Sequence, residues 1–268
     1  MKDVRISMVQ MSSVPGDPEH NLEKIKAFIR DAEGSDIICF PELSLTGYAM
    51  SAGYAVAADD ALIKEISRTA SENGIAAAFG FAEREGERMY ISHGITGKDG
   101  TLSIYRKTHL GVSEKKHFTP GSRLTTIGTD KVRIGLQICA ESHFPEVSAC
   151  LRYRGAELIL MPHAWPGDAG RRTDLWRRYL PARAYDNGVF VAACNSVVND
   201  GGGGTMVLDP KGRTIGEDSS NRESMLTVIL DGSMILRVPP EERKSMRDTD
   251  FFSSRRPELY SDVTRPMT

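Results

Sequence analysis

Three side chains with complementary chemistry each come just after a predicted β-strand. They are Cys139 after 132–138, Glu42 after 36–40 and Lys107 after 102–105. In an α/β fold, ligands gather at the ends of the strands. A thiol can act as a nucleophile, a carboxylate can accept the proton that the thiol loses, and an ammonium group can stabilise a developing oxyanion. Together they indicate thiol-based covalent catalysis.

Each of the three also has an ordinary structural interpretation when it is considered alone. A free cysteine is most often a small buried hydrophobe. A glutamate after a proline is typical of the first turn of a helix, and a lysine in a loop is commonly solvated. Catalysis by Cys139 is therefore a hypothesis that needs Glu42 and Lys107 beside the thiol.

The stretch 132–138 predicts how Cys139 is positioned. It alternates apolar with polar or small residues and closes on apolar ones, which predicts a strand that enters a covered sheet. Pro145 and Glu146 follow, and both residue types are favoured in the first turn of a helix. Cys139 would then lie on a bend between a strand and a helix, where backbone N–H groups can face a substrate oxygen.

The rest of the chain alternates predicted strands and helices, recognised from apolar runs and from helical spacing of apolar residues. The predicted strands are 4–11, 36–40, 75–82, 89–96, 102–105, 132–138, 158–161, 189–194, 205–208, 213–216 and 224–230. The predicted helices are 18–32, 60–73, 145–154, 171–187 and a short one near 232–236. This alternation predicts an α/β sandwich. Because no linker composition divides the chain, residues 1–268 are expected to form a single domain.

Composition and charge exclude several classes of function. The 268 residues are 40% hydrophobic and 26% charged, which is ordinary for a globular protein. The net charge of −2 offers no electrostatic footprint for nucleic acid. No apolar run reaches membrane-spanning length, and the first residues lack the apolar segment of a signal peptide. We therefore expect a soluble, cytoplasmic protein without a membrane or nucleic-acid partner.

No metal, cofactor or disulfide is predicted. The cysteines (Cys39, Cys139, Cys150, Cys194) lack zinc-site spacing, and so do the histidines (His109, His117, His143, His163). Disulfides are uncommon in a cytoplasmic chain of this size. The glycine run 201–204 lacks the lysine of a P-loop and the spacing of a dinucleotide-binding motif, so it is predicted to be a loop.

The residues around the three side chains resemble the signatures of the nitrilase, or carbon–nitrogen hydrolase, superfamily. They are Phe40-Pro41-Glu42 with Thr46-Gly47-Tyr48, Tyr105-Arg106-Lys107-Thr108-His109-Leu110, and Ile138-Cys139 followed by Phe144-Pro145-Glu146. The similarity continues through Gly155-Ala156, Ala182-Arg183-Ala184 with Asn187, Asp209-Pro210-Lys211-Gly212 and Arg255-Arg256-Pro257-Glu258. Three ordered motifs at family-like spacing make this a specific resemblance over nearly the whole chain.

The resemblance implies a role for each side chain. Cys139 would form a thioester, Glu42 would carry the protons, and Lys107 with the backbone N–H of Ala140 would stabilise the tetrahedral oxygen. Glu114 matches a further catalytic carboxylate that the family often places beside the lysine, and a solvated surface position is its alternative. The implied reaction is hydrolysis of a non-peptide amide with release of ammonia or an amine. N-carbamoyl amides and nitriles are the alternative substrates.

The resemblance also implies a four-layer αββα sandwich. It implies a homodimer packed through helices near 145–154 and 172–187, with the tail 245–268 packing on the partner subunit. Two departures from the family pattern bear on the substrate. Glu141 stands where many relatives have aspartate, and the glycine run 201–204 replaces bulkier residues.

Five residues near the expected pocket are predicted to contact the substrate: Tyr48, Ala140, His163, Trp165 and Arg172. Arg171 or Arg172 could hold a substrate carboxylate, because a guanidinium fork fits a carboxylate bidentately. The alternative for both arginines is a charged helix start that faces solvent.

Two rival interpretations remain. Cys139 and His143 are four residues apart, so they could form a Cys–His pair if the bend is helical. The chain could also be a binding or regulatory protein that keeps the fold without catalysis, although such a scaffold has no need of Glu42, Lys107 and Cys139 together.

Overall fold

The computed structural model describes residues 1–48, 52–198, 201–235, 242 and 251–265, and the described residues form two six-stranded sheets. The first sheet has the order β14 (Ser224–Leu230), β1 (Val4–Gln10), β2 (Ile37–Cys39), β3 (Ala76–Glu85), β4 (Arg88–Thr96) and β5 (Leu102–Arg106). The strands β1, β2 and β3 run parallel, and the outer strands pair antiparallel to them.

The second sheet repeats this plan. Its order is β13 (Thr214–Asp218), β12 (Thr205–Leu208), β9 (Phe190–Asn195), β8 (Leu158–His163), β7 (Arg133–Leu136) and β6 (Thr126–Gly128). The strands β7, β8 and β9 are parallel, so their carboxyl ends meet at one edge of the sheet. Each sheet therefore has a central parallel part of the kind that carries ligand sites in α/β proteins.

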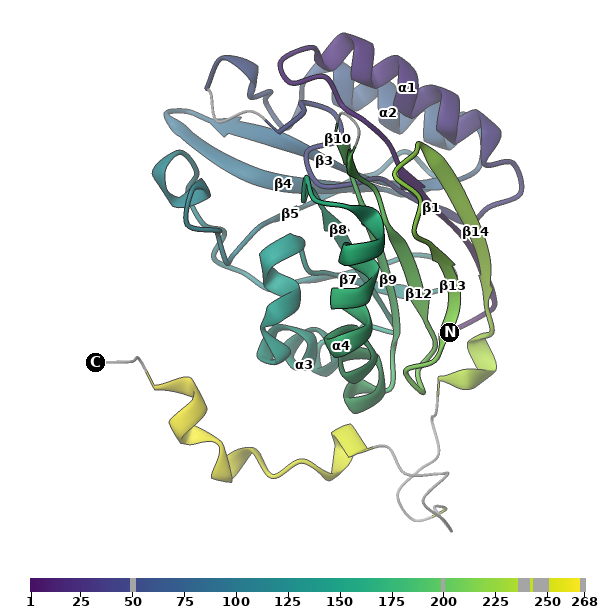
Figure 1. The fold of residues 1–268 in the computed structure, drawn as a ribbon, viewed down its shortest axis with the longest axis vertical. Helices are drawn as coiled ribbons and strands as arrows, with labels where there is room; N and C mark the ends of the chain where they lie inside the picture. The colour runs from purple at the N-terminus through teal and green to yellow at the C-terminus, as the bar shows by residue number, and fades with distance from the viewer. Residues whose placement is uncertain (49–51, 199–200, 236–241, 243–250, 266–268) are drawn as a thin grey trace.

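Two helices cover the outer face of each sheet (Figure 1). The helices α1 (Pro18–Asp31) and α2 (Ala61–Glu72) pack on the first sheet, and α3 (Pro145–Tyr153) and α4 (Ala169–Asn187) pack on the second. The carboxylates of Asp17, Asp60 and Asp168 cap the first turns of α1, α2 and α4 by accepting backbone N–H groups. The predicted four-layer αββα sandwich is confirmed.

Three apolar layers hold the four structural layers together. One lies between the two sheets, and one lies between each sheet and its helices. Strand β8 contributes to two of them, because Leu158 and Leu160 face the other sheet while Ile159 and Met161 face α3 and α4. The continuous apolar runs of the central strands follow from this burial on both faces.

Several sequence predictions need correction. Strand β6 was not predicted. The sequence assigned no partner to the last strand, β14, which joins the first sheet beside β1. Within the glycine run that was predicted to be a loop, Gly201–Gly202 forms the two-residue strand β11, paired with β10 (Val197–Val198). The short helix near 232–236 is a 3₁₀ turn at Gly232–Met234, and residue 236 lies outside the described residues.

The described part of the tail, residues 251–265, contains the short 3₁₀ helices Phe251–Ser254, Pro257–Leu259 and Ser261–Thr264. This segment runs past the ends of α3 and α4 (Figure 1), and the Phe251 ring lies 6.1 Å from that of Tyr185 on α4. Residues 245–250 and 266–268 are outside the described residues, and packing of the tail on a partner stays a prediction. No helix among the described residues is both long and apolar enough to cross a membrane.

Candidate active site

The loops after β2 and β5 bring two carboxylates onto one buried lysine. Lys107 Nζ lies 2.7 Å from Oε1 of Glu42 and 2.9 Å from Oε1 of Glu114. Lys107 is fully buried, and the two glutamates are 2% and 4% exposed. Glu114 is therefore not a solvated surface residue, and buried charges of this kind are tolerated because they are paired.

Glu42 keeps one carboxylate oxygen free. Its Oε1 is held by Lys107, whereas its buried Oε2 has no close hydrogen-bond donor among the described residues, and the nearby Cys139 thiol lowers the pKa of the carboxyl only slightly. Burial raises the pKa of Glu42, and the Lys107 charge only partly opposes that shift. A carboxylate with a raised pKa and an open oxygen is suited to taking and returning a proton.

Cys139 lies on the tight turn Cys139–His143, directly beyond the end of β7. Its φ of 49° is left-handed, and Leu43, next to Glu42, is the other described non-glycine residue with positive φ, at 56°. Such strained backbone persists only where the surrounding structure enforces it, and it is concentrated at functional sites. The two strained residues thus mark the loops of the candidate nucleophile and of the candidate base.

Burial and the charges around Cys139 determine how readily its thiol ionises. Burial and, to a smaller extent, the negative charge of Glu42 raise the pKa of the thiol, which lies at about 12. The positive charges of Lys107 and Arg172 act in the opposite direction. Free thiolate is therefore scarce at neutral pH, so reaction requires that the proton be removed as the sulfur attacks.

Lys107 remains a cation despite its burial. Burial alone would lower its pKa, but the charges of Glu42, Cys139 and Glu114 outweigh that effect and raise it. Glu114 is held in turn by the hydroxyl of Tyr48, which donates to Oε1 at 3.1 Å, and by the N–H of Gly111, which donates to Oε2 at 2.6 Å. Tyr48 is 39% exposed, so this chain of contacts runs from the buried lysine to the protein surface.

Glu141 is a residue of the site whose role the sequence did not predict. Its carboxylate accepts hydrogen bonds from the N–H groups of Ile138 at 2.8 Å and of Thr108 at 2.7 Å, and from the Tyr105 hydroxyl at 2.8 Å. Although burial favours the neutral acid, the hydrogen bonds lower the pKa of Glu141. This carboxylate joins the turn of Cys139 to the loop of Lys107. The signal in the sequence was an acidic residue two positions after the cysteine, where many relatives have aspartate.

The remaining predicted contacts lie on the second sheet and on α4. His163 is buried, and both ring nitrogens have protein partners: Nδ1 lies 2.8 Å from Met161 O, and Nε2 lies 3.3 Å from Ser142 Oγ. That hydroxyl donates to Cys139 O at 2.7 Å, so His163 supports the cysteine turn. Trp165 is partly buried, and its backbone N–H donates to Asn195 Oδ1 at 2.7 Å. Ala140, half-buried, directly follows the thiol in the same turn.

His143 and the two arginines of the rival interpretations are also placed. The His143 ring stacks on Tyr179, with centroids 4.7 Å apart, and no hydrogen bond joins it to Cys139 among the described residues. Arg171 is exposed, as expected for a solvent-facing helix start. Arg172, by contrast, is only 5% exposed and lies over the indole rings of Trp165 and Trp176.

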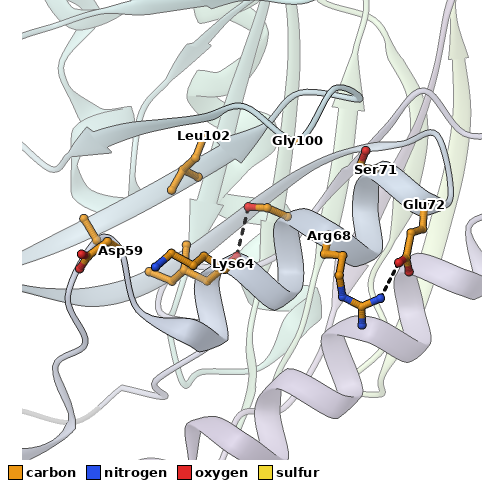
Figure 2. Close-up of a pocket in the computed structure, with 10 residues that line it drawn as sticks. Asp59, Lys64, Arg68, Ser71, Glu72, Gly100 and Leu102 are labelled. Carbon is orange, nitrogen blue, oxygen red and sulfur yellow. Dashed lines mark hydrogen bonds and ion pairs between the residues drawn. The ribbon is translucent and has the colours of Figure 1, made fainter.

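A separate groove of about 550 Å³ lies along α2 and the start of β5 (Figure 2), and none of its lining residues belongs to the site described above. It is lined by Ala58, Asp59, Ile63, Lys64, Ser67, Arg68, Ser71, Glu72, Gly100 and Leu102. Arg68 there is paired with Glu65 and Glu72. Among the described residues, no group of three or more histidine, cysteine, aspartate or glutamate side chains is arranged to hold a metal ion.

The whole chain is similar to characterised amide-cleaving and nitrile-cleaving enzymes. The family model for carbon-nitrogen hydrolases matches residues 5–239. An (R)-stereoselective amidase from a Pseudomonas species is 31% identical over 271 residues, covering 97% of this chain and 94% of that protein. A nitrilase from Pyrococcus abyssi is 29% identical, covering 96% of this chain and 99% of its own.

The fold is similar to that of solved members of the nitrilase superfamily. An amidase from a Nesterenkonia species superimposes with a TM-score of 0.82 at 30% identity, covering 97% of this chain and 96% of that one. In another structure of that amidase, acrylamide is covalently added at the active-site cysteine.

Proposed function

Because the chain belongs to the carbon–nitrogen hydrolase family, we propose that it hydrolyses a non-peptide amide with Cys139 as nucleophile, Glu42 as base and Lys107 as the cation at the reacting oxygen. It is a hydrolase that acts on carbon–nitrogen bonds other than peptide bonds. The observation that carries the assignment of roles is the free, buried Oε2 of Glu42 beside a fully buried Lys107 and a thiol with a raised pKa.

The reaction runs in two stages. The Cys139 sulfur attacks the amide carbon while its proton passes to Glu42, and a tetrahedral intermediate forms. Glu42 then gives the proton to the leaving nitrogen, so that ammonia or an amine departs and a thioester remains. In the second stage Glu42 removes a proton from water, the water oxygen attacks the thioester carbon, and the thiol is regenerated as the carboxylic acid leaves.

Lys107 and the backbone of Ala140 stabilise the oxygen of each tetrahedral intermediate. The Lys107 ammonium is fixed by two carboxylates before substrate arrives, so little reorganisation is needed when the oxygen becomes negative. Glu114 orients that ammonium as a positioning residue. Tyr48 holds Glu114 from the outer side of the site.

The proposed substrate is an amide, and Tyr48, His163 and Trp165 are its predicted contacts. Amide hydrolysis comes first because the similar proteins include amidases over nearly their full length. N-carbamoyl compounds and nitriles are the alternatives, since thioester chemistry at the same carbon serves all three and a nitrilase is also similar.

The test is release of ammonia from a panel of amides, carbamoyl compounds and nitriles. We expect release by the wild type and by Cys150→Ala, which removes an exposed thiol on α3, and none by Cys139→Ala. The relative rates rank the three substrate classes. Equal release by the wild type and Cys139→Ala would remove Cys139 from the active site and refute the mechanism.

A homodimer formed through α3 and α4 belongs to the same proposal. Tyr153 on α3 is 83% exposed and Tyr185 on α4 is 47% exposed, which are large fractions for aromatic side chains. Light scattering on a size-exclusion column should give twice the chain mass for the wild type and a monomer for Tyr153→Glu. A wild-type monomer at micromolar concentration would contradict this part of the proposal.

A further inference from the structure

Arg172 is a buried guanidinium that lacks a carboxylate partner among the residues the structure describes. It lies in the first turn of α4, is 5% exposed, and its Nε is buried without a hydrogen bond. Arg106, by comparison, pairs with Glu83 and Glu85. An unpaired buried charge is costly, so this arginine points to an anion that binds when the site is filled.

Two indole rings restrict where the guanidinium can lie. The Arg172 Cζ atom is 5.3 Å from the ring centroid of Trp165 and 5.1 Å from that of Trp176. Contacts of this kind hold the cation and shield it from water, but they do not satisfy its N–H groups. The fork is therefore partly preorganised for an acceptor that it does not find in the free protein.

Contacts connect this arginine to the cysteine turn. The Trp176 ring lies 4.9 Å from the His163 ring, and His163 reaches Ser142, whose hydroxyl donates to Cys139 O. The electrostatics agree, because the positive charge of Arg172 lowers the pKa of Cys139 as well as that of His163. Arg172 is therefore linked to the cysteine turn through Trp176, His163 and Ser142.

The other charged groups around the cysteine turn are already engaged. Glu42 and Glu114 are both bound to Lys107. Arg183, the next cation along α4 to approach the turn, donates to the backbone carbonyls of Ser142 and His143. Arg172 is thus the buried cation beside the reacting centre for which a substrate group is the missing partner.

We propose that Arg172 binds the carboxylate of the substrate, so that the preferred substrates are small amides carrying a second, anionic end, such as monoamides of dicarboxylic acids. This inference rests on the proposed function, since it assigns the far end of the molecule whose amide Cys139 attacks. A bidentate pair inside an aromatic, water-poor site fixes both the distance and the orientation of that amide.

The experiment compares substrates that differ in charge but not in shape. Succinamate and 4-methylpentanamide share a carbon chain and end in a carboxylate and an isopropyl group of similar outline. Glutaramate and 5-methylhexanamide extend the comparison by one carbon. Wild type should have a higher kcat/KM for the anionic member of at least one pair. The pair with the larger preference indicates which chain length spans the distance from Arg172 to the thiol.

The variants are Arg172→Met, Arg172→Lys and the neighbouring Arg171→Met. We expect Arg172→Met to lower the ratio of kcat/KM for the anionic over the neutral substrate about 10-fold to 100-fold, mainly through KM, as for loss of a charged hydrogen bond. Arg172→Lys, which keeps the charge and loses the fork, should fall between. Arg171 is exposed, so Arg171→Met should leave the ratio within twofold of wild type.

If Arg172→Met lowers kcat/KM equally for the anionic and the neutral member of a pair, the inference is overturned. Arg172 would then act on the environment of the Cys139 thiol, and the proposed amide hydrolysis would stand. Binding supplies a readout without turnover. In Cys139→Ala, calorimetry should show tighter binding of succinamate than of 4-methylpentanamide, and the difference should vanish with Arg172→Met added. If binding shows this preference but wild type hydrolyses no amide, the proposed function is refuted while the anion site at Arg172 stands.

Discussion

Glu141 accepts a hydrogen bond from the backbone N–H of Thr108 at 2.7 Å, which joins the turn of the candidate nucleophile to the loop of the candidate cation. Thr108 is the residue after Lys107, and Glu141 also accepts the N–H of Ile138, the residue before Cys139. The relative placement of the thiol and the ammonium therefore depends on one buried carboxylate.

We predict that Glu141→Ala lowers kcat/KM about 100-fold, as expected for a displacement of about 1 Å in a reacting group. Loss of the acceptor leaves buried N–H groups unpaired, which should lower the free energy of unfolding by about 1–3 kcal/mol. Ammonia release and urea unfolding measure the two effects. Glu146→Gln changes an exposed carboxylate on α3 and should match wild type in both. Wild-type kinetics in Glu141→Ala would remove Glu141 from the site.

Glu141 also predicts a pH dependence of stability. Hydrogen bonds lower its folded pKa below the ordinary value of 4.5, so the carboxylate stabilises the folded state above that pH. The contribution is lost as the pH falls through the folded pKa. The pH dependence of stability contributed by Glu42 has the opposite sign, because burial raises the pKa of Glu42. Urea unfolding between pH 3 and 7 should therefore give a wild-type advantage over Glu141→Gln that shrinks toward acid, and a constant difference would contradict the assignment.

The three strand ends were predictable from different patterns. The strand β2 is a buried apolar run, β7 alternates and then closes on apolar residues, and β5 is a partly buried antiparallel edge strand. The stretches before Glu42, Lys107 and Cys139 correspond to β2, β5 and β7. The αββα arrangement and the family came from motifs rather than from periodicity. Both are confirmed by the two sheets with their covering helices and by the similar proteins.

Other features depend on contacts between distant residues and left no local signal. Strand β6 is three residues long and carries no apolar run. The pairing of β14 with β1 joins residues more than 200 positions apart. The role of Glu141 depends on its hydrogen bond with Thr108, whose loop approaches Glu141 only in the folded chain. The unpaired state of Arg172 likewise could not be read from an arginine-rich helix start, where Arg171 faces solvent and Arg172 does not.

The two carboxylates on Lys107 should differ in what they do. Glu42→Gln removes the oxygen that takes the proton, and we predict a fall in kcat of about 10²–10⁴-fold. Glu114→Gln removes one of two ion-pair partners and should cost about tenfold, or about 1.4 kcal/mol. Single-turnover measurements with one amide compare them directly. An equal loss in both variants would show that the base has been wrongly assigned.

The same assignment fixes the acid limb of the pH profile. Because burial raises the pKa of Glu42 above 4.5, kcat/KM of the wild type should decline as the pH falls through a value above 4.5. Protonated Glu42 cannot accept the thiol proton, so the sign of the effect is loss of activity in acid. A profile that stays flat down to pH 4 would be incompatible with Glu42 as the base.

Gly80 on β3 allows the loop of Glu42 to lie against the first sheet. A methyl group at this position would come within 2.3 Å of Leu43 N and 2.9 Å of the Glu42 carbonyl carbon. Both are backbone atoms, and Leu43 already has a left-handed φ of 56°. The loop cannot yield without moving Glu42 relative to Lys107, because Gly80 O also accepts the N–H of Leu45.

We therefore predict that Gly80→Ala destabilises the protein by about 1–3 kcal/mol and lowers kcat/KM at least tenfold. Gly128→Ala is the control, since a methyl group on that β6 residue would meet only the Arg133 side chain, at 3.7 Å. Thermal unfolding and ammonia release are measured for both variants. A stable Gly80→Ala with reduced kcat would place the effect in the position of Glu42. Unchanged kinetics would mean that the loop relaxes without disturbing the base.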